Sequence, residues 1–181
     1  MTTISKLFAA GILITAFFTN NIQAQNQLPN MELSNIYGEK VNISEYGKSD
    51  KITLFSFWAT WCGPCKKELN NLQEVYPEWK EKYNLQIVAV STDDQRSSPK
   101  VRPYVEGQGW EYDVLLDVNE ELKRQLNFQS VPHTVLVNQK GEIVSQHDGY
   151  VEGDEYEILE KELIKLTTPA AQDSEKVEDR K

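Results

Sequence analysis

The order of hydrophobic and polar positions predicts strands and helices in alternation over most of the chain. Residues 52–57 are β-branched and aromatic, as in a buried strand, and apolar residues then recur at helical spacing from Cys65 to Trp79. A second apolar run, 85–90, follows this helix. A strand, a helix and a strand in this order form a unit whose two strands are parallel and whose crossover is right-handed.

Shorter patterns predict the remaining elements and place the chain in the α/β class. Pro77 falls inside the first helical pattern, where it removes a hydrogen bond and clashes with the preceding turn, so we expect the helix to kink or divide there. The other expected elements are short strands at 31–36 and 41–43, a helix at 99–107, a strand at 114–116, a helix at 120–126 capped by Asn119, a hairpin of 134–137 with 142–146, and an amphipathic helix at 154–166.

The two ends of the chain differ from its centre. Residues 1–24 carry one lysine, an apolar run and a small residue at Ala24, which is the order of a secretory signal peptide. The run is shorter than the ~20 apolar residues of a membrane-spanning helix, so we expect cleavage near Ala24, with an uncleaved anchor as the alternative. Residues 168–181 are polar and predict a disordered tail. One domain is expected at 28–167, in the periplasm or another extracytoplasmic space.

The charge excludes two classes of partner. The leader holds one lysine and no acid, so the chain without it carries 28 acidic and 18 basic residues. Nucleic acids and anionic membranes are bound through basic patches, and an acidic surface of this size argues against both.

The chain contains two cysteines, Cys62 and Cys65, at the junction of the first strand and its helix. A helix N-terminus favours a thiolate, and Pro64 suits the first helical turn. This spacing predicts a redox pair in which Cys62 attacks a substrate disulfide and Cys65 resolves the mixed disulfide. The alternatives are a structural disulfide and half of a zinc site, although the second cysteine pair that a thiolate zinc site needs is absent.

Two motifs far apart in the sequence carry a resemblance to a known family. Residues 61–65 read Trp-Cys-Gly-Pro-Cys, and residues 131–134 read Val-Pro-His-Thr. Together they resemble the thioredoxin superfamily and, within it, the exported TlpA/ResA-like thiol-disulfide oxidoreductases, over about residues 28–166. The resemblance implies a thioredoxin-like fold, with a mixed central sheet flanked by helices, an N-terminal β-hairpin and one inserted helix.

The resemblance also implies roles for individual residues. Pro132 would follow a cis peptide bond and face the cysteines, because cis bonds are nearly confined to proline. The substrate-binding residues would be Trp61, Gly63, Pro64, Val131, Pro132 and His133. Thioredoxins keep a buried aspartate where this chain has Ser56, whereas Glu68 matches an active-site glutamate of the ResA-like proteins. A buried Glu68 with a raised pKa would accept the proton of Cys65; the alternative is a solvated glutamate beside Lys66 and Lys67.

We therefore expect an exported thiol-disulfide oxidoreductase that reduces disulfides of other exported proteins and needs no cofactor. The Gly63-Pro64 dipeptide resembles the reducing end of the superfamily. A monomer is expected, with electrons supplied by a membrane-bound donor protein, and cytochrome c maturation is a use that the resemblance suggests. The alternatives are a disulfide-introducing oxidase, a thiol peroxidase and a copper-binding carrier. No Thr-x-x-Cys arrangement of peroxidases is present, and His133 is expected as a loop side chain at the rim of the site rather than a copper ligand.

Overall fold

The computed structural model describes residues 26–168, and its centre is a mixed seven-stranded sheet with the strand order β2-β1-β5-β4-β3-β6-β7. Strands β3, β4 and β5 are parallel, and all other neighbours are antiparallel. The strands are β1 (Glu32–Asn35), β2 (Lys40–Asn42), β3 (Ile52–Trp58), β4 (Leu85–Ser91), β5 (Asp113–Leu116), β6 (His133–Val137) and β7 (Ile143–Asp148).

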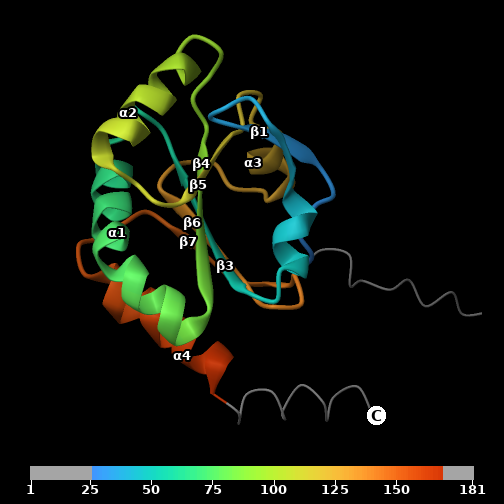
Figure 1. The fold of residues 1–181 in the computed structure, drawn as a ribbon, viewed down its shortest axis with the longest axis vertical. Helices are drawn as coiled ribbons and strands as arrows, with labels where there is room; N and C mark the ends of the chain where they lie inside the picture. The colour runs from blue at the N-terminus through green and yellow to red at the C-terminus, as the bar shows by residue number, and fades with distance from the viewer. Residues whose placement is uncertain (1–25, 169–181) are drawn as a thin grey trace, which may run out of the picture.

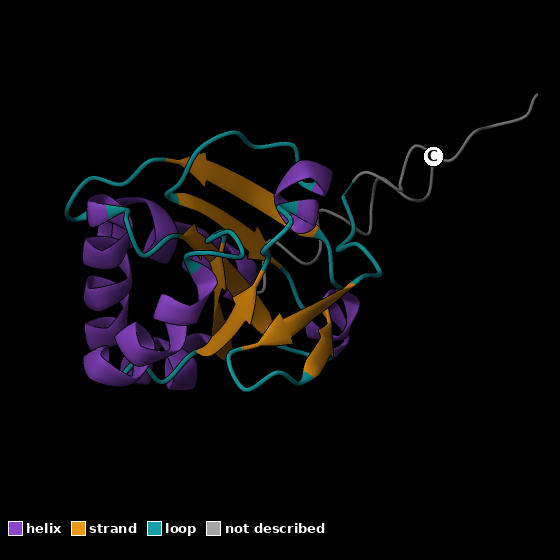
Figure 2. Ribbon diagram, turned by 90° about the horizontal axis from the view of Figure 1, so that it is seen from above, coloured by secondary structure: helices purple, strands orange, loops and turns teal. Residues whose placement is uncertain are grey.

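Helices cover both faces of this sheet. Figure 1 shows α1, α2 and α4 along one face, with α3 and the 3-10 helix η2 on the other, and Figure 2 shows the twist of the sheet beside the helices. The helices are η2 (Ile43–Lys48), α1 (Gly63–Tyr83), the 3-10 turn η3 (Ser98–Lys100), α2 (Val101–Gln108), α3 (Glu121–Gln125), the π-helical η4 (Glu155–Glu160) and α4 (Lys161–Thr167).

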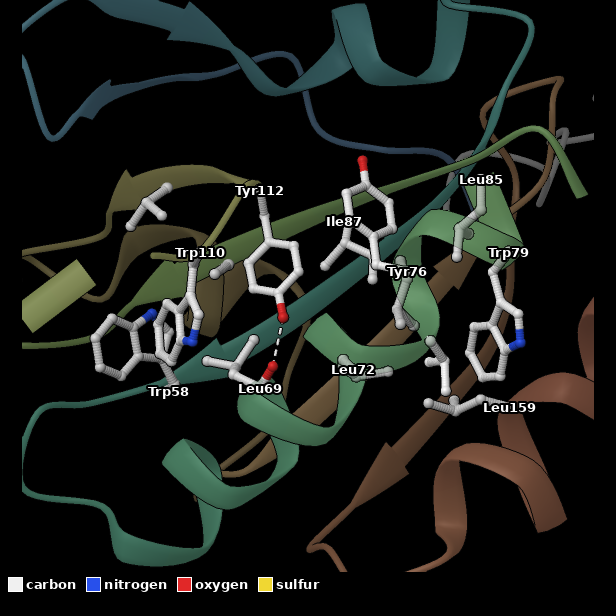
Figure 3. Close-up of a cluster of buried hydrophobic side chains, with 14 of the residues drawn as sticks. Trp58, Leu69, Leu72, Tyr76, Trp79, Leu85, Ile87, Trp110, Tyr112 and Leu159 are labelled. Atoms are coloured by element: carbon white, nitrogen blue, oxygen red, sulfur yellow. Dashed lines mark hydrogen bonds between the residues drawn. The ribbon is translucent and has the colours of Figure 1, made fainter. Parts of the chain in front are cut away.

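The alternation of side chains along β3 divides the core into two clusters. All seven residues of β3 are buried, because helices or loops lie over both of its faces. Ile52, Leu54 and Trp58 pack with α1, whereas Phe55 and Phe57 pack on the opposite face. Figure 3 shows part of the first cluster, in which side chains of α1 meet those of β3, β4, η4 and the segment just before β5.

Most of the predicted elements are confirmed. Strands β3 and β4 pair in parallel from Ile52↔Leu85 to Trp58↔Ser91, and β6 forms the expected hairpin with β7. The N-terminal hairpin of β1 and β2 joins the sheet through β5, and α2 is the inserted helix.

The helix does not divide at Pro77, since α1 is a single helix that contains this proline, and the alternative of a kink stays a prediction. A proline inside a helix costs about 3 kcal/mol or more through its lost hydrogen bond and its clash. Tyr76 and Trp79 flank Pro77 and are buried in the first cluster, at 6 % and 1 % exposure. Burial of these two large side chains offsets the cost, so the helix continues to Tyr83.

The predicted cap of the short helix after β5 is also wrong. Asn119 does not cap it, and Glu120 lies in the left-handed region with φ 53°. The carboxylate of Asp117, 1 % exposed, accepts the N–H groups of Glu121, Leu122 and Lys123 at 2.7, 3.2 and 2.9 Å. Asp117 therefore caps α3. It lies two positions before Asn119, directly after the end of β5.

The C-terminal element begins as η4 and continues as α4, with Leu159 and Leu163 buried against the core. Helix α2 continues past Gly107 to Gln108, and its C-cap is Gly109, whose φ of 67° is left-handed. The predicted signal peptide at 1–24 and all but Thr168 of the predicted tail lie outside the described residues. Between residues 26 and 168, no helix has both the length and the apolar character needed to cross a membrane.

Candidate active site

Cys62 and Cys65 lie where the chain leaves β3 and enters α1, at the carboxyl end of the parallel strands. They form a disulfide with Cα atoms 5.4 Å apart. Cys62 is the N-cap of α1, and its Sγ accepts the backbone N–H of Cys65 at 3.3 Å. No acidic residue occupies the first turn, and Pro64 stands at its start. The positive end of the helix is therefore directed at Cys62, where it favours a thiolate.

The two sulfurs differ in access in the expected order. Cys62 is 5 % exposed and Cys65 is fully buried, while the neighbouring Trp61 is 70 % exposed. Gly63 and Pro64 also lie at the surface. Cys62 is thus less exposed than the sequence suggested, but within the pair it alone retains contact with solvent. Cys62 is therefore the more accessible residue of the pair.

The loop before β6 adopts the expected conformation, because the Val131–Pro132 peptide bond is cis. Val131 is partly buried and packs against both core clusters, one of which contains the two cysteines. The carbonyl of Pro132 accepts the N–H of Gly149 at 2.8 Å, which ties this loop to the segment after β7. That Val131 and Pro132 face the cysteines and bind the substrate stays a prediction.

His133 does not lie where the sequence suggested. It is the first residue of β6 and is 3 % exposed, so it is not a loop side chain at the rim. Its ring stacks on Phe128, with centroids 4.0 Å apart, and its two nitrogens lie 2.8 Å from Asp148 Oδ1 and 3.0 Å from Gln146 Oε1. Side chains alternate along a strand, and His133 shares the face of Val135, opposite the cluster that holds the cysteines.

The three residues that a copper site would use, Cys62, Cys65 and His133, do not lie together. His133 lies across the sheet from Cys62 and Cys65, and among residues 26–168 no group of three or more His, Cys, Asp or Glu side chains is placed to hold a metal ion. His147 lies in β7 with Nε2 3.3 Å from the Glu162 carboxylate oxygens.

Glu68 is a buried carboxyl group on α1. It lies one helical turn after Cys65, is 3 % exposed, and accepts a hydrogen bond from the Ser56 hydroxyl at 3.2 Å. The nearby lysines are engaged elsewhere: Lys67 pairs with Glu152 at 2.6 Å, and the Lys66 ammonium lies over the Tyr104 ring, 5.4 Å from its centroid. The alternative of a solvated glutamate beside these lysines is wrong.

Tyr112 connects the surroundings of Glu68 to the core. Its hydroxyl donates to the carbonyl of Leu69, as Figure 3 shows, and Trp110 beside it donates to Asn70 Oδ1 at 2.8 Å. Burial raises the pKa of Tyr112 well above that of a free tyrosine, and the nearby Tyr76 and Glu68 raise it further. The tyrosine therefore stays neutral and remains a donor to α1 at every pH relevant to thiol chemistry.

Sequence reasoning missed a polar cluster behind the active-site turn. Asp93, 1 % exposed, follows β4, and its carboxylate accepts hydrogen bonds from Thr60 and Ser91. One signal was available in the sequence. Parallel strands end at the same edge of a sheet, so polar residues that follow 85–90 are expected beside the turn that follows 52–57.

Comparison of the chain with known proteins identifies its family. The AhpC/TSA family matches residues 24–146, which is more than half of the chain. The chain belongs to the AhpC/TSA family.

Relatives of this AhpC/TSA family member agree on its fold and chemistry. The thiol-disulfide oxidoreductase ResA of Bacillus thuringiensis subsp. konkukian is 24 % identical over 159 residues, which cover 87 % of each protein. The thioredoxin-like protein YneN of Bacillus subtilis is 31 % identical over 137 residues, 75 % of this chain and 78 % of that protein. The solution structure of a thioredoxin-like protein from Porphyromonas gingivalis is 40 % identical with a TM-score of 0.68, over 79 % of this chain and 95 % of that one.

The family member has a thioredoxin-like fold, and it is a thiol-disulfide oxidoreductase. The sequence holds no cysteine besides the pair at the N-terminus of α1.

Proposed function

We propose that this protein is exported and reduces disulfides in other exported proteins. The proposal is supported by the difference in burial between the two cysteines. Cys62 has the greater access and stands at the positive end of α1, and Cys65 is buried behind it. Such a pair supports one nucleophile that meets the substrate and one that resolves the intermediate.

The exchange proceeds in two steps from the reduced protein. The Cys62 thiolate attacks one sulfur of the substrate disulfide, forms a mixed disulfide and releases the other substrate sulfur as a thiolate. Cys65 then loses its proton and attacks the Cys62 sulfur, which re-forms the Cys62–Cys65 disulfide and releases the second substrate thiolate. Two electrons pass to the substrate, and the protein ends in the oxidised form that the structure shows.

The proton of Cys65 passes to Glu68 in this scheme. Glu68 lies one turn along the same helix, and residues three apart on a helix are neighbours. Burial disfavours the charged form of a carboxyl group, so a buried glutamate is a stronger base than a solvated one near ~4.3. Ser56 lies on β3 at the position where thioredoxins have an aspartate. Its hydroxyl donates a hydrogen bond to the Glu68 carboxyl group.

Three further features complete the proposal. Residues 1–24 have the pattern of a signal peptide, which supports export to an extracytoplasmic space. The substrate binds around Cys62, on a surface formed by Trp61, Gly63, Pro64 and the Val131–Pro132 loop. Regeneration of the dithiol outside the cytosol needs a membrane-bound donor protein, and cytochrome c maturation is one process in which such a reductant would serve.

The reduction potential of the Cys62–Cys65 couple tests the direction of electron flow. Equilibration of the purified protein in glutathione buffers is expected to give a potential at or below that of glutathione, nearer the ~−270 mV of thioredoxin. The reduced protein is also expected to cleave the disulfides of insulin. A potential near the ~−120 mV of a strong oxidant would make the protein a disulfide donor and would overturn the proposed direction.

A further inference from the structure

The carboxylate of Asp93 is attached to the turn that carries Cys62. Its Oδ2 accepts the backbone N–H of Thr60 at 2.8 Å, and its Oδ1 accepts the Thr60 hydroxyl at 2.6 Å. The Ser91 hydroxyl donates to Oδ2 at 2.9 Å and in turn accepts the N–H of Asp93 at 3.1 Å. Asp93 is 1 % exposed, so these bonds form in a site from which water is largely excluded.

The same loop holds the turn at a second point. The N–H of Thr92 donates to the carbonyl of Trp58 at 2.8 Å, next to the register pair Trp58↔Ser91 of the parallel strands. Within the turn, the N–H of Cys62 donates to the carbonyl of Ala59 at 3.0 Å. The turn is therefore fixed by Thr92 where it leaves β3 and by Asp93 at Thr60, two residues before Cys62.

We propose that Asp93 is a positioning residue of the redox pair: through Thr60 it keeps Cys62 within reach of Cys65 and thereby stabilises the disulfide relative to the dithiol. The inference rests on the proposed function, since it explains how a pair in this position attains the low potential of a reductant. Asp93 touches neither sulfur and takes no part in the exchange itself.

The turn acts through the effective concentration of the Cys62 sulfur beside the Cys65 sulfur. In the disulfide the covalent bond itself restrains Cys62, whereas in the dithiol the turn on one side and the first turn of α1 on the other restrain it. A turn fixed at Thr60 therefore loses little freedom when the bond forms, but a loosened turn loses much more. The freedom of one loop residue corresponds to about a tenfold change in an equilibrium constant. Loosening the turn is expected to shift the equilibrium toward the dithiol by that factor.

The measured equilibrium is the reaction of the reduced protein with glutathione disulfide, which gives the protein disulfide and two molecules of glutathione. Thr60→Val keeps the shape of the side chain and removes the hydroxyl that Asp93 accepts. Its equilibrium constant is expected to fall about tenfold, a rise of about 30 mV for a two-electron couple. Thr60→Ser keeps the hydroxyl and is expected to stay within twofold of the wild type.

Two conditions separate positioning from other effects. The equilibrium is measured from about pH 4 to about pH 8, because a change in thiolate stability alters the pH dependence of the constant, whereas a positioning effect lowers the constant equally at every pH. Urea unfolding of the oxidised variants shows whether the fold is intact. Asp93→Asn, which replaces one acceptor oxygen by a donor, provides a second variant and is expected to change the constant in the same direction as Thr60→Val.

The outcomes distinguish this inference from the proposed function. If Thr60→Val folds and its constant stays within twofold of the wild type, or rises, the positioning role is wrong whatever the potential of the wild type. If Thr60→Ser falls as far as Thr60→Val, the hydroxyl is not the cause and the inference also fails. A wild-type potential near that of a strong oxidant would overturn the reductant proposal, while the difference between the two threonine variants would still test Asp93.

Discussion

Replacement of Glu68 by glutamine tests whether this buried carboxyl group acts as the base for Cys65. Glutamine has nearly the same shape and retains an oxygen that can accept the Ser56 hydroxyl, whose bond to Glu68 is 3.2 Å long. The fold of Glu68→Gln is therefore expected to remain intact. What the variant loses is the ability to take up a proton.

The expected magnitude follows from the burial of the site. Cys65 is fully buried and Glu68 is 3 % exposed, so bulk water has little access to the Cys65 proton in the structure. A positioned general base contributes typically 10²–10⁴-fold to a proton-transfer step. Resolution of the mixed disulfide is therefore expected to slow by at least about tenfold. Formation of the mixed disulfide depends on Cys62 and is expected to change by less than about twofold.

The assay follows the two steps separately. Reduced protein is mixed rapidly with a peptide disulfide, and the mixed disulfide and the released thiols are quantified after acid quenching at successive times. The pH dependence of each step is measured for the wild type and for Glu68→Gln. Glu74→Gln is the matched control, because Glu74 lies on the same helix and is exposed.

Two results would refute the reasoning. Resolution in Glu68→Gln within about twofold of the wild type would show that the carboxyl group does not handle the proton. An equal slowing of both steps would show a general disturbance of the α1 N-terminus instead of the loss of a base. A slowing of resolution alone, absent from Glu74→Gln, is the expected outcome.

Two further predictions concern the cysteine pair and the α3 cap. Cys65→Ser is expected to accumulate mixed disulfides with substrate proteins through Cys62, whereas Cys62→Ser is not, and equal trapping in non-reducing gels would contradict the division of roles. Asp117→Asn is expected to cost about 1–2 kcal/mol in urea unfolding at neutral pH, because it weakens a cap of three N–H groups. Burial raises the pKa of Asp117, so its stabilising contribution is full below the unfolded pKa of about 3.9 and declines as pH rises through the folded pKa. The deficit of the variant is therefore expected to be larger at pH 3 than at pH 7, and a deficit that grows with pH would contradict this assignment.

Periodicity was sufficient to predict most of the elements because burial in this chain follows the secondary structure closely. The run 52–57 is apolar on both sides and becomes the central strand β3, and the helical spacing from Cys65 to Trp79 becomes the buried face of α1. The site could be located for the same reason, since both cysteines fall at the junction of these two elements. The cis bond before Pro132 came from the resemblance and not from the pattern.

The errors arose where a contact depends on a partner far away in sequence. The position of His133 required the register of β6, whose alternation sets this residue on the side of Val135 and away from the cysteines. The cap of α3 required the direction in which the chain leaves β5, which brings Asp117 rather than Asn119 to the helix N-terminus. Neither follows from local propensity, because each depends on how the sheet is assembled.

Ser56 and Glu68 are a case in which the sequence contained more than the local pattern revealed. Ser56 lies in a strand that is apolar on both faces, and Glu68 lies beside Cys65 and Leu69 on the buried side of α1. A buried hydroxyl and a buried carboxyl group each need a hydrogen-bond partner, and the βα unit packs the helix against this strand. Pairing the two would have predicted the observed bond. The requirement that buried polar groups have hydrogen-bond partners thus links Ser56, a strand position without an acid, to Glu68, a buried acid one helical turn after Cys65.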